Sequence, residues 1–454
     1  MARIGVALAV TRGHRCILAA CKVFSATFSK RGPAVNAGLV IVSATLLLVA
    51  AVSRPLSSTP ITPAMVVVAV GVLVGPLVLD DLTVPPTSST VRTLAEATLA
   101  VVLFSDSSRV NLRALQREAS MPVRLLSVGL PLTIVLGGLL AVALFGSFSF
   151  SEALILGVIL APTDAGLGSA VVTDPRLPQV VRQSLNVESG LNDGICVPLL
   201  LIVLATVSGA GGESHPLRVL AEEIGYGLLG GLAAGALAAA VVIIAGGRHL
   251  IDDAWRQIIP LAAAVLAYGI ANALGGSGFI AAFVAGALFG LLAGGKLAGM
   301  MRFTEETGAV LDGVTFLIFG AVLLGPAFEH LSWQITLYAV LSLTLVRMLP
   351  VAISLWGTHA RAPTVAFMGW FGPRGLASIV FAVIVEDAHL PHAGTIVAAS
   401  YLTVGLSVLL HGLSAAPLVS HYATWYQAAA DKNPPAMEGQ PAHEHRARGV
   451  LRLP

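Results

Sequence analysis

The feature that most constrains this chain is a series of apolar stretches, each long enough to cross a lipid bilayer. A membrane-spanning helix needs roughly 20 predominantly apolar residues, and the hydropathy pattern predicts thirteen spans of about this length. The predicted spans are residues 35–53, 61–79, 91–105, 122–146, 150–172, 186–208, 219–246, 256–273, 276–292, 306–327, 332–355, 364–386 and 394–414. Because backbone polar groups in lipid must be satisfied within the protein, the pattern predicts an all-α integral membrane protein.

The composition agrees with this class and excludes others. Charged residues make up 11% of the 454 residues, and the mean hydropathy is +0.87, whereas soluble domains contain about 25% charged residues. A net charge of +2 is too small to indicate a nucleic-acid partner. The chain has no phosphate-binding Gly-x-x-x-x-Gly-Lys-Ser/Thr motif and no evident nucleophile–base pair. We therefore expect that the protein is not an enzyme, that it uses no cofactor and that it binds no nucleic acid. Its expected surroundings are the lipid bilayer.

Two terminal segments stand apart from the predicted spans. Residues 1–33 are basic and contain no acid, which indicates a mis-chosen start codon or a disordered tail, with a targeting peptide as the alternative. The predicted transmembrane domain covers residues 34–416. The polar segment 417–454 is predicted to be a disordered tail.

The distribution of basic residues between loops predicts the orientation. With thirteen spans, one set of alternate loops carries most of the Lys and Arg residues, whereas the opposite set carries only Arg92 and Arg218 once residues 1–33 are set aside. Basic loops face the cytoplasm. The pattern therefore predicts a multi-pass protein of the plasma membrane with a cytoplasmic C-terminus.

Two short runs within the predicted spans, residues 161–166 and 186–194, together carry three carboxylates. Asp164 lies between Pro162 and Gly166, which together predict an interruption of the fifth helix. Glu188 and Asp193 lie in the sixth span. An ionisable side chain at membrane depth costs roughly 2.5–3.5 kcal/mol on insertion scales, so each of the three carboxylates marks a candidate functional site.

The spacing around these carboxylates indicates a site for a small cation. Ser189 and Asp193 are four residues apart, as are Glu188 and Asn192, so each pair lies on one face of a helix. Thr163 adds a hydroxyl next to carbonyl groups that an interrupted helix leaves free. Hydroxyl, carboxylate and carbonyl oxygens together suit a hard metal cation.

Two arginines in the later spans lie away from any predicted loop. Arg374 is flanked by Gly372, Pro373 and Gly375, which predict a second interruption, and Arg347 lies in the span before it. Paired interruptions in corresponding halves of a chain indicate a transport site between inverted repeats. The sequence therefore predicts two broken helices that cross near the membrane midplane, one with an acid and one with a base.

Three sequence runs carry a family resemblance. The runs "APTDAGLGSAVVTDPRLP" and "LNVESGLNDG", with "GWFGPRG" at Gly369–Gly375, resemble bacterial sodium/proton antiporters of the NhaP type. These antiporters belong to the monovalent cation:proton antiporter family, and the resemblance extends from about Gly38 to His411. It implies a homodimer in which a bundle containing both interruptions moves against the early spans.

The resemblance also implies roles for the candidate residues. Asp193 is expected to hold either a proton or a cation but not both. Asp164, Thr163 and Ser189 are expected to bind the Na⁺, although Asp164 has the alternative role of capping its broken helix. Asn192 stands where related exchangers with two aspartates carry an acid, and is expected to form hydrogen bonds across the helix breaks.

Glu188 is expected to have a structural role. The helical period turns it away from Asp193, and a second uncompensated acid there would be costly, so it should pair with an arginine. Arg347 and Arg374 are both candidates for this ion pair, and the sequence does not decide between them.

The predicted function is the electroneutral exchange of a monovalent cation for H⁺ by alternating access. Sodium is the predicted cation, with lithium and potassium as alternatives. Two other functions remain open: a cation channel or leak pathway on the same site, and a sensor that no longer transports.

Overall fold

The computed structural model describes residues 34–56, 59–75, 89–110, 120–208, 216–294, 299–388, 390–432 and 437–439. Within these residues the chain is helical and forms no strand. The predicted segment 1–33 lies outside the described residues.

The first half of the fold contains the first interrupted helix. In chain order its helices are α2 (Ala34–Leu56), α3 (Pro63–Val74), α4 (Ser89–Arg109), α6 (Ser120–Arg124) with a π turn at Leu125–Gly129, α7 (Leu130–Leu144), α8 (Phe150–Ile159), α9 (Ser169–Val172) and α10 (Gln179–Ser208). The chain leaves the helix after Ile159 and resumes it at Ser169. The break lies where Pro162 and Gly166 predict it.

The second half contains the second interrupted helix. Its helices are α11 (Pro216–Ala240), α12 (Asp253–Ala273), α13 (Gly278–Ala293), α14 (Arg302–Ile318), α15 (Leu324–Ala327), α16 (Trp333–Leu343), α17 (Leu345–Ser354), α18 (Ala362–Trp370), α19 (Leu376–Asp387) and α20 (Ala393–Lys432), with π turns at Val241–Ala245 and Phe319–Leu323 and a short 3₁₀ turn at Phe328–His330. Residues 371–375 separate α18 from α19. This break coincides with the predicted one around Arg374.

Each of the thirteen predicted ranges is occupied by one or more of these helices. Seven helical stretches in the described residues are long and apolar enough to cross a membrane. They are Met121–Leu144, Gln179–Val207, Arg218–Ala245, Asp253–Ala273, Arg302–His330, Trp333–Ser354 and Ala393–Ala429. The all-α membrane class is therefore supported, and the count of thirteen spans stays a prediction.

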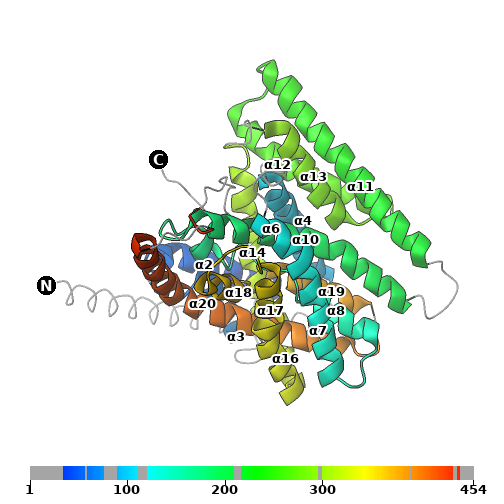
Figure 1. The fold of residues 1–454 in the computed structure, drawn as a ribbon. Coiled ribbons are helices and arrows are strands. Elements are labelled where there is room, and N and C mark those ends of the chain that lie inside the picture. The colour runs from blue at the N-terminus through cyan, green and yellow to red at the C-terminus, as the bar shows by residue number, and fades with distance from the viewer. Residues whose placement is uncertain are drawn as a thin grey trace.

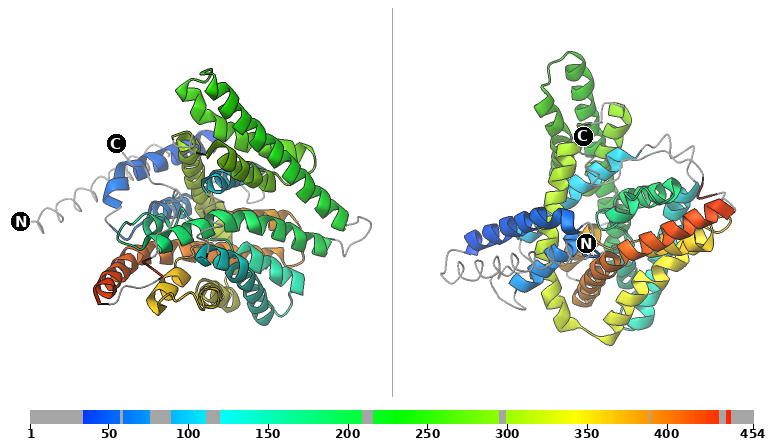
Figure 2. Two further views of the ribbon diagram at one scale, coloured as in Figure 1. Left: turned by 45° about the horizontal axis from the view of Figure 1, so that its top comes forward. Right: turned by 90° about the vertical axis from the view of Figure 1, so that its left-hand side faces the viewer.

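The helices form two groups that meet along α4 and α10. Helices α11, α12 and α13 pack on one another and on α4, and they project from the rest of the molecule (Figures 1 and 2). Gly231 and Gly235 of α11 lie so close to the backbone of α13 at Ala281 and Ala285 that a Cβ atom would clash. Small residues allow this close packing of helices in lipid.

The other group surrounds the two interruptions. Helix α8 packs against α7 and α10, and α20 packs against α16 and α19. The main hydrophobic core runs between α8, α10, α19 and α20. Figure 1 shows these helices below the α11–α13 group. The interruptions therefore lie inside a packed bundle, where protein groups can satisfy the freed backbone.

The structure differs from the predicted disordered tail. Helix α20 continues past Pro417 to Lys432, and the ring of Tyr422 stacks on Phe367 of α18 at 4.4 Å between centroids. Burial of these apolar side chains stabilises the helix where composition alone indicates disorder. Further along, Glu438 is buried and accepts hydrogen bonds from Arg361 N and Thr364 Oγ1.

Candidate ion-binding site

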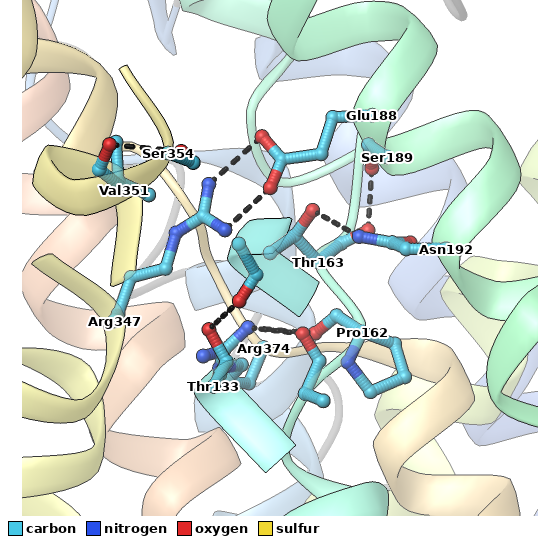
Figure 3. A network of polar contacts seen from close by, with 12 residues as sticks. Thr133, Pro162, Thr163, Glu188, Ser189, Asn192, Arg347, Val351, Ser354 and Arg374 are labelled. Carbon is cyan, nitrogen blue, oxygen red and sulfur yellow. Dashed lines mark hydrogen bonds and ion pairs between the residues drawn. The ribbon is translucent and has the colours of Figure 1, made fainter. Parts of the chain in front are cut away.

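The two interruptions are joined by direct hydrogen bonds. The backbone amide of Asp164 donates to the carbonyl of Pro373 at 2.8 Å. In return, the Arg374 guanidinium donates to the carbonyls of Ala161 (2.7 Å) and Pro162 (3.0 Å), as Figure 3 shows for Pro162. Each break thus supplies partners for backbone groups that the other leaves without a helical partner.

The Asp164 carboxylate caps the start of α19 and binds backbone amides in the turn before α9. Oδ1 accepts hydrogen bonds from Gly166 N (2.7 Å) and Leu167 N (3.2 Å), and Oδ2 accepts one from Leu376 N at 3.0 Å. Leu376 begins α19, so the carboxylate lies at the positive end of that helix dipole. The capping role that the sequence left as an alternative is therefore present in the structure.

Helix α10 holds the first interruption from the other side. Ser189 Oγ donates to the carbonyl oxygen of Thr163, and Asn192 Nδ2 donates to Thr163 Oγ1 at 2.8 Å (Figure 3). All three side chains are buried. The four-residue periodicity of α10 places Ser189 and Asp193 on the same helical face, so Asp193 lies next to this polar contact along α10.

Asp193 lies in the middle of α10 and is 7% exposed. The next residue, Gly194, faces the ring of Phe283 on α13 so closely that a Cβ atom would overlap it. This contact brings the Asp193 turn of α10 to the boundary between the two helix groups. The Asp193 carboxylate therefore lies in the turn of α10 that meets this boundary.

Both carboxylate and uncharged oxygen atoms lie near the first interruption. Among the described residues, no group of three His, Cys, Asp or Glu side chains is arranged to hold a metal ion. The oxygens near this interruption come from the carboxylates of Asp164 and Asp193, from Thr163, Ser189 and Asn192, and from the interrupted backbone. Carboxylate oxygens and carbonyls freed at a broken helix are groups that can coordinate a monovalent cation.

The structure pairs Glu188 with Arg347. The two side chains form two hydrogen bonds of 2.5 and 2.9 Å between α10 and α17 (Figure 3), and each residue is 3% exposed. Gly372 permits this arrangement, because a Cβ atom there would collide with the Arg347 guanidinium. The second interruption therefore touches this ion pair as well as the first interruption.

Arg374 has a different environment. It is completely buried, forms no ion pair with a described carboxylate, and donates through Nη1 to the two carbonyls of the first interruption. Its positive charge therefore lies at the carbonyl end of α8, the negative end of that helix dipole.

Sequence reasoning missed three polar residues that contact the interruptions. Ser378 Oγ donates to the carbonyl of Ile159 at 2.7 Å, and Ser407 and His411 of α20 contact the second interruption. The one feature of the sequence that could have pointed to these residues is their position in apolar spans. A single intramembrane serine usually bonds to its own helix, so that signal is weak.

The chain is similar to several known proteins. The family described as "Sodium/hydrogen exchanger, transmembrane" matches residues 41–421. The chain is 28% identical over 396 residues to a protein of Shewanella oneidensis named K(+)/H(+) antiporter NhaP2, covering 82% of this chain and 65% of that protein. It is also 29% identical over 266 residues to a Schizosaccharomyces pombe protein named Na(+)/H(+) antiporter, covering 54% of this chain and 56% of that protein.

The fold is similar to a solved structure. The sodium proton antiporter MjNhaP1 of Methanocaldococcus jannaschii superposes with a TM-score of 0.70 at 20% identity, covering 86% of this chain and 98% of the other. The chain thus spans nearly all of that structure but about two thirds of the Shewanella relative.

Proposed function

Since this chain belongs to the sodium/hydrogen exchanger family, we propose that it exchanges a monovalent cation for protons across a membrane. One observation carries the proposal: α10 places the carboxylate of Asp193 one turn from the Ser189–Thr163 contact at an interrupted helix. The carboxylate supplies the group that binds a proton, and the surrounding oxygens supply ligands for a cation.

Competition at Asp193 is the proposed basis of exchange. The carboxylate binds a cation together with oxygens of Ser189, Thr163 and the freed backbone, or it binds a proton. The two states exclude each other. If the site is exposed first to one side of the membrane and then to the other, uptake of one ion requires release of the other, and the result is antiport.

The charges of the neighbouring residues favour one proton for each cation. We propose that Asp164, whose carboxylate accepts three backbone N–H bonds, keeps the same charge in both loaded states. Glu188 is held by Arg347, and Asn192 does not titrate. Asp193 is then the only group that exchanges its proton, and the loaded site has the same charge in both directions.

Sodium is the cation we propose, with lithium and potassium as alternatives. The Shewanella relative is named for K⁺ and the fission-yeast relative for Na⁺, so the relatives support a monovalent cation of either kind. We further propose a homodimer, as the family resemblance implies. The distribution of basic loops supports a plasma-membrane protein with a cytoplasmic C-terminus.

The decisive experiment is a proteoliposome assay with a trapped pH-sensitive dye. Addition of Na⁺, Li⁺ or K⁺ in turn should move protons in the wild-type protein, with saturation and counterflow. The Asp193→Asn variant should show no cation-driven proton movement while it unfolds thermally at a similar temperature.

Other outcomes separate the alternatives. Single-channel currents in place of saturable counterflow would favour a channel or leak pathway. A folded wild-type protein that moves no ion would favour a sensor. Wild-type exchange rates in Asp193→Asn would overturn the assignment of the site.

A further inference from the structure

The backbone between α18 and α19 leaves polar groups without helical partners. The helix ends at Trp370 and resumes at Leu376, and Pro373 lacks an amide hydrogen. Groups of this kind inside a membrane must find partners in the surrounding protein. The Arg374 amide finds its partner on α20, and the Trp370 carbonyl, which accepts from Gly372 N at 2.8 Å, finds a second partner there.

Ser407 and His411 supply those partners. The Arg374 amide donates to Ser407 Oγ at 2.7 Å, and His411 Nε2 lies 2.9 Å from the Trp370 carbonyl oxygen. Ser407 Oγ and His411 Nδ1 are 3.2 Å apart. Both side chains are buried, at 0% and 2% exposed, so the contacts are shielded from water.

These contacts link α20 to both ends of the gap. Arg374 N–H donates to Ser407 Oγ, and His411 Nε2–H donates to the Trp370 carbonyl. On its other side, His411 Nδ1 lies 3.0 Å from the Ser407 carbonyl oxygen and 3.2 Å from Ser407 Oγ, so the ring is held between its own helix and the gap.

Trp370 is attached to the same face of α20 by two further contacts. Its ring stacks on His411 with 5.1 Å between centroids, and its Nε1 donates to Ser414 Oγ at 2.9 Å. Ser407, His411 and Ser414 follow the spacing i, i+4 and i+7, which places them along one side of the helix.

The segment held in this way contacts the first interruption directly. The Pro373 carbonyl accepts from the Asp164 amide, the Leu376 amide donates to the Asp164 carboxylate, and Arg374 binds the carbonyls of the first break. A shift of the second interruption would therefore move Asp164 and the backbone next to Thr163.

We propose that Ser407 and His411 are positioning residues for the cation site, which fix the second interruption so that it holds the first in its binding geometry. This inference rests on the proposed antiport function. Neither side chain touches the ion, and both act through Arg374 and the backbone around it.

The test uses the reconstituted full-length protein and four variants: His411→Leu, His411→Gln, Ser407→Ala and Ser400→Ala. His411→Leu and Ser407→Ala should each raise the half-saturating cation concentration about three- to tenfold, as loss of a neutral hydrogen bond permits, with a smaller change in maximal rate. His411→Gln should recover most of the affinity, because its amide can donate to the Trp370 carbonyl.

Ser400→Ala is the matched control. Ser400 is equally buried on α20, but its hydroxyl bonds to the carbonyl of Ile396 in its own helix. This variant should keep the wild-type cation affinity. If Ser400→Ala weakens binding as much as Ser407→Ala does, or if His411→Leu lowers only thermal stability, the positioning role is wrong.

Hydrogen–deuterium exchange gives a readout independent of transport. In His411→Leu, amides in residues 160–168 and 371–376 should exchange faster, whereas in Ser400→Ala they should match the wild type. Unchanged exchange in residues 160–168 would overturn the inference even if transport is impaired. Conversely, a wild-type protein that moves no cation would overturn the proposed function. The hydrogen–deuterium exchange measurement would still decide whether α20 positions the interruptions.

Discussion

Glu188 and Arg347, 159 positions apart in the chain, form a buried ion pair with two hydrogen bonds of 2.5 and 2.9 Å. The pair joins α10, which carries Asp193, to α17. Breaking a buried pair by removing one partner costs roughly 3–5 kcal/mol, because the remaining charge is left uncompensated. The pair therefore has a structural consequence that can be measured separately from ion binding.

We predict that Glu188→Ala lowers the stability of the protein more than it changes cation affinity. The temperature of thermal unfolding in detergent should fall clearly below that of the wild type. The double variant with Arg347→Ala should recover part of that loss, with a coupling of about 0.5–3 kcal/mol. Arg374→Ala is the comparison: equal coupling of Glu188 to Arg374 would contradict the observed pairing.

Asp164→Asn is predicted to impair both stability and exchange. The amide retains a carbonyl oxygen for Gly166 and Leu167, but its NH₂ group faces the Leu376 amide, which is a donor. An unsatisfied buried donor costs about 1–3 kcal/mol. Proton movement in liposomes should be lost, and the unfolding temperature should fall. If Asp164→Asn is as stable as the wild type, Asp164 does not stabilise the helix start. If the variant transports as fast as the wild type, Asp164 has no role in the ion site.

Gly375→Ala is predicted to disturb the site through steric overlap alone. A Cβ atom at Gly375 would collide with the Asp164 carboxylate, whereas one at Gly394 meets nothing within 4 Å. Overpacking costs typically about 1–3 kcal/mol. Gly375→Ala should therefore reduce exchange and stability, and Gly394→Ala serves as the control in the same assays. Equal exchange and stability of the two variants would show that the close approach of Gly375 to the Asp164 carboxylate is not needed for either.

Exchange is predicted to be independent of the membrane potential. Each elementary charge moved across the membrane is worth about 2.3 kcal/mol per 100 mV, so a cycle that moves no net charge is unaffected. Sodium-driven proton flux should stay constant in liposomes clamped at different potentials with potassium and valinomycin. A flux that varies with potential would reveal a second titrating group, and Asp164 would be examined first by repeating the measurement with Asp164→Asn.

The sequence by itself determined the class of the protein and the candidate residues of its ion site. Apolar stretches long enough for a bilayer, and the carboxylates within them, can be read along the chain, and an ionisable group in lipid is costly enough to mark a candidate site. Pro162, Gly166, Gly372 and Pro373 likewise predicted both interruptions, because the conformational limits of Pro and Gly are local properties.

The tertiary structure alone decided the partners. Arg347 and Arg374 both lie inside apolar spans, and only the rotation and depth of α17 and α19 relative to α10 place Arg347, and not Arg374, against Glu188. The contacts of His411 were equally hidden, since its acceptor lies 41 positions away on another helix. The sequence shows that a polar group lies in an apolar span, where its burial is costly. Which partner offsets that cost depends on how helices distant in the chain pack together.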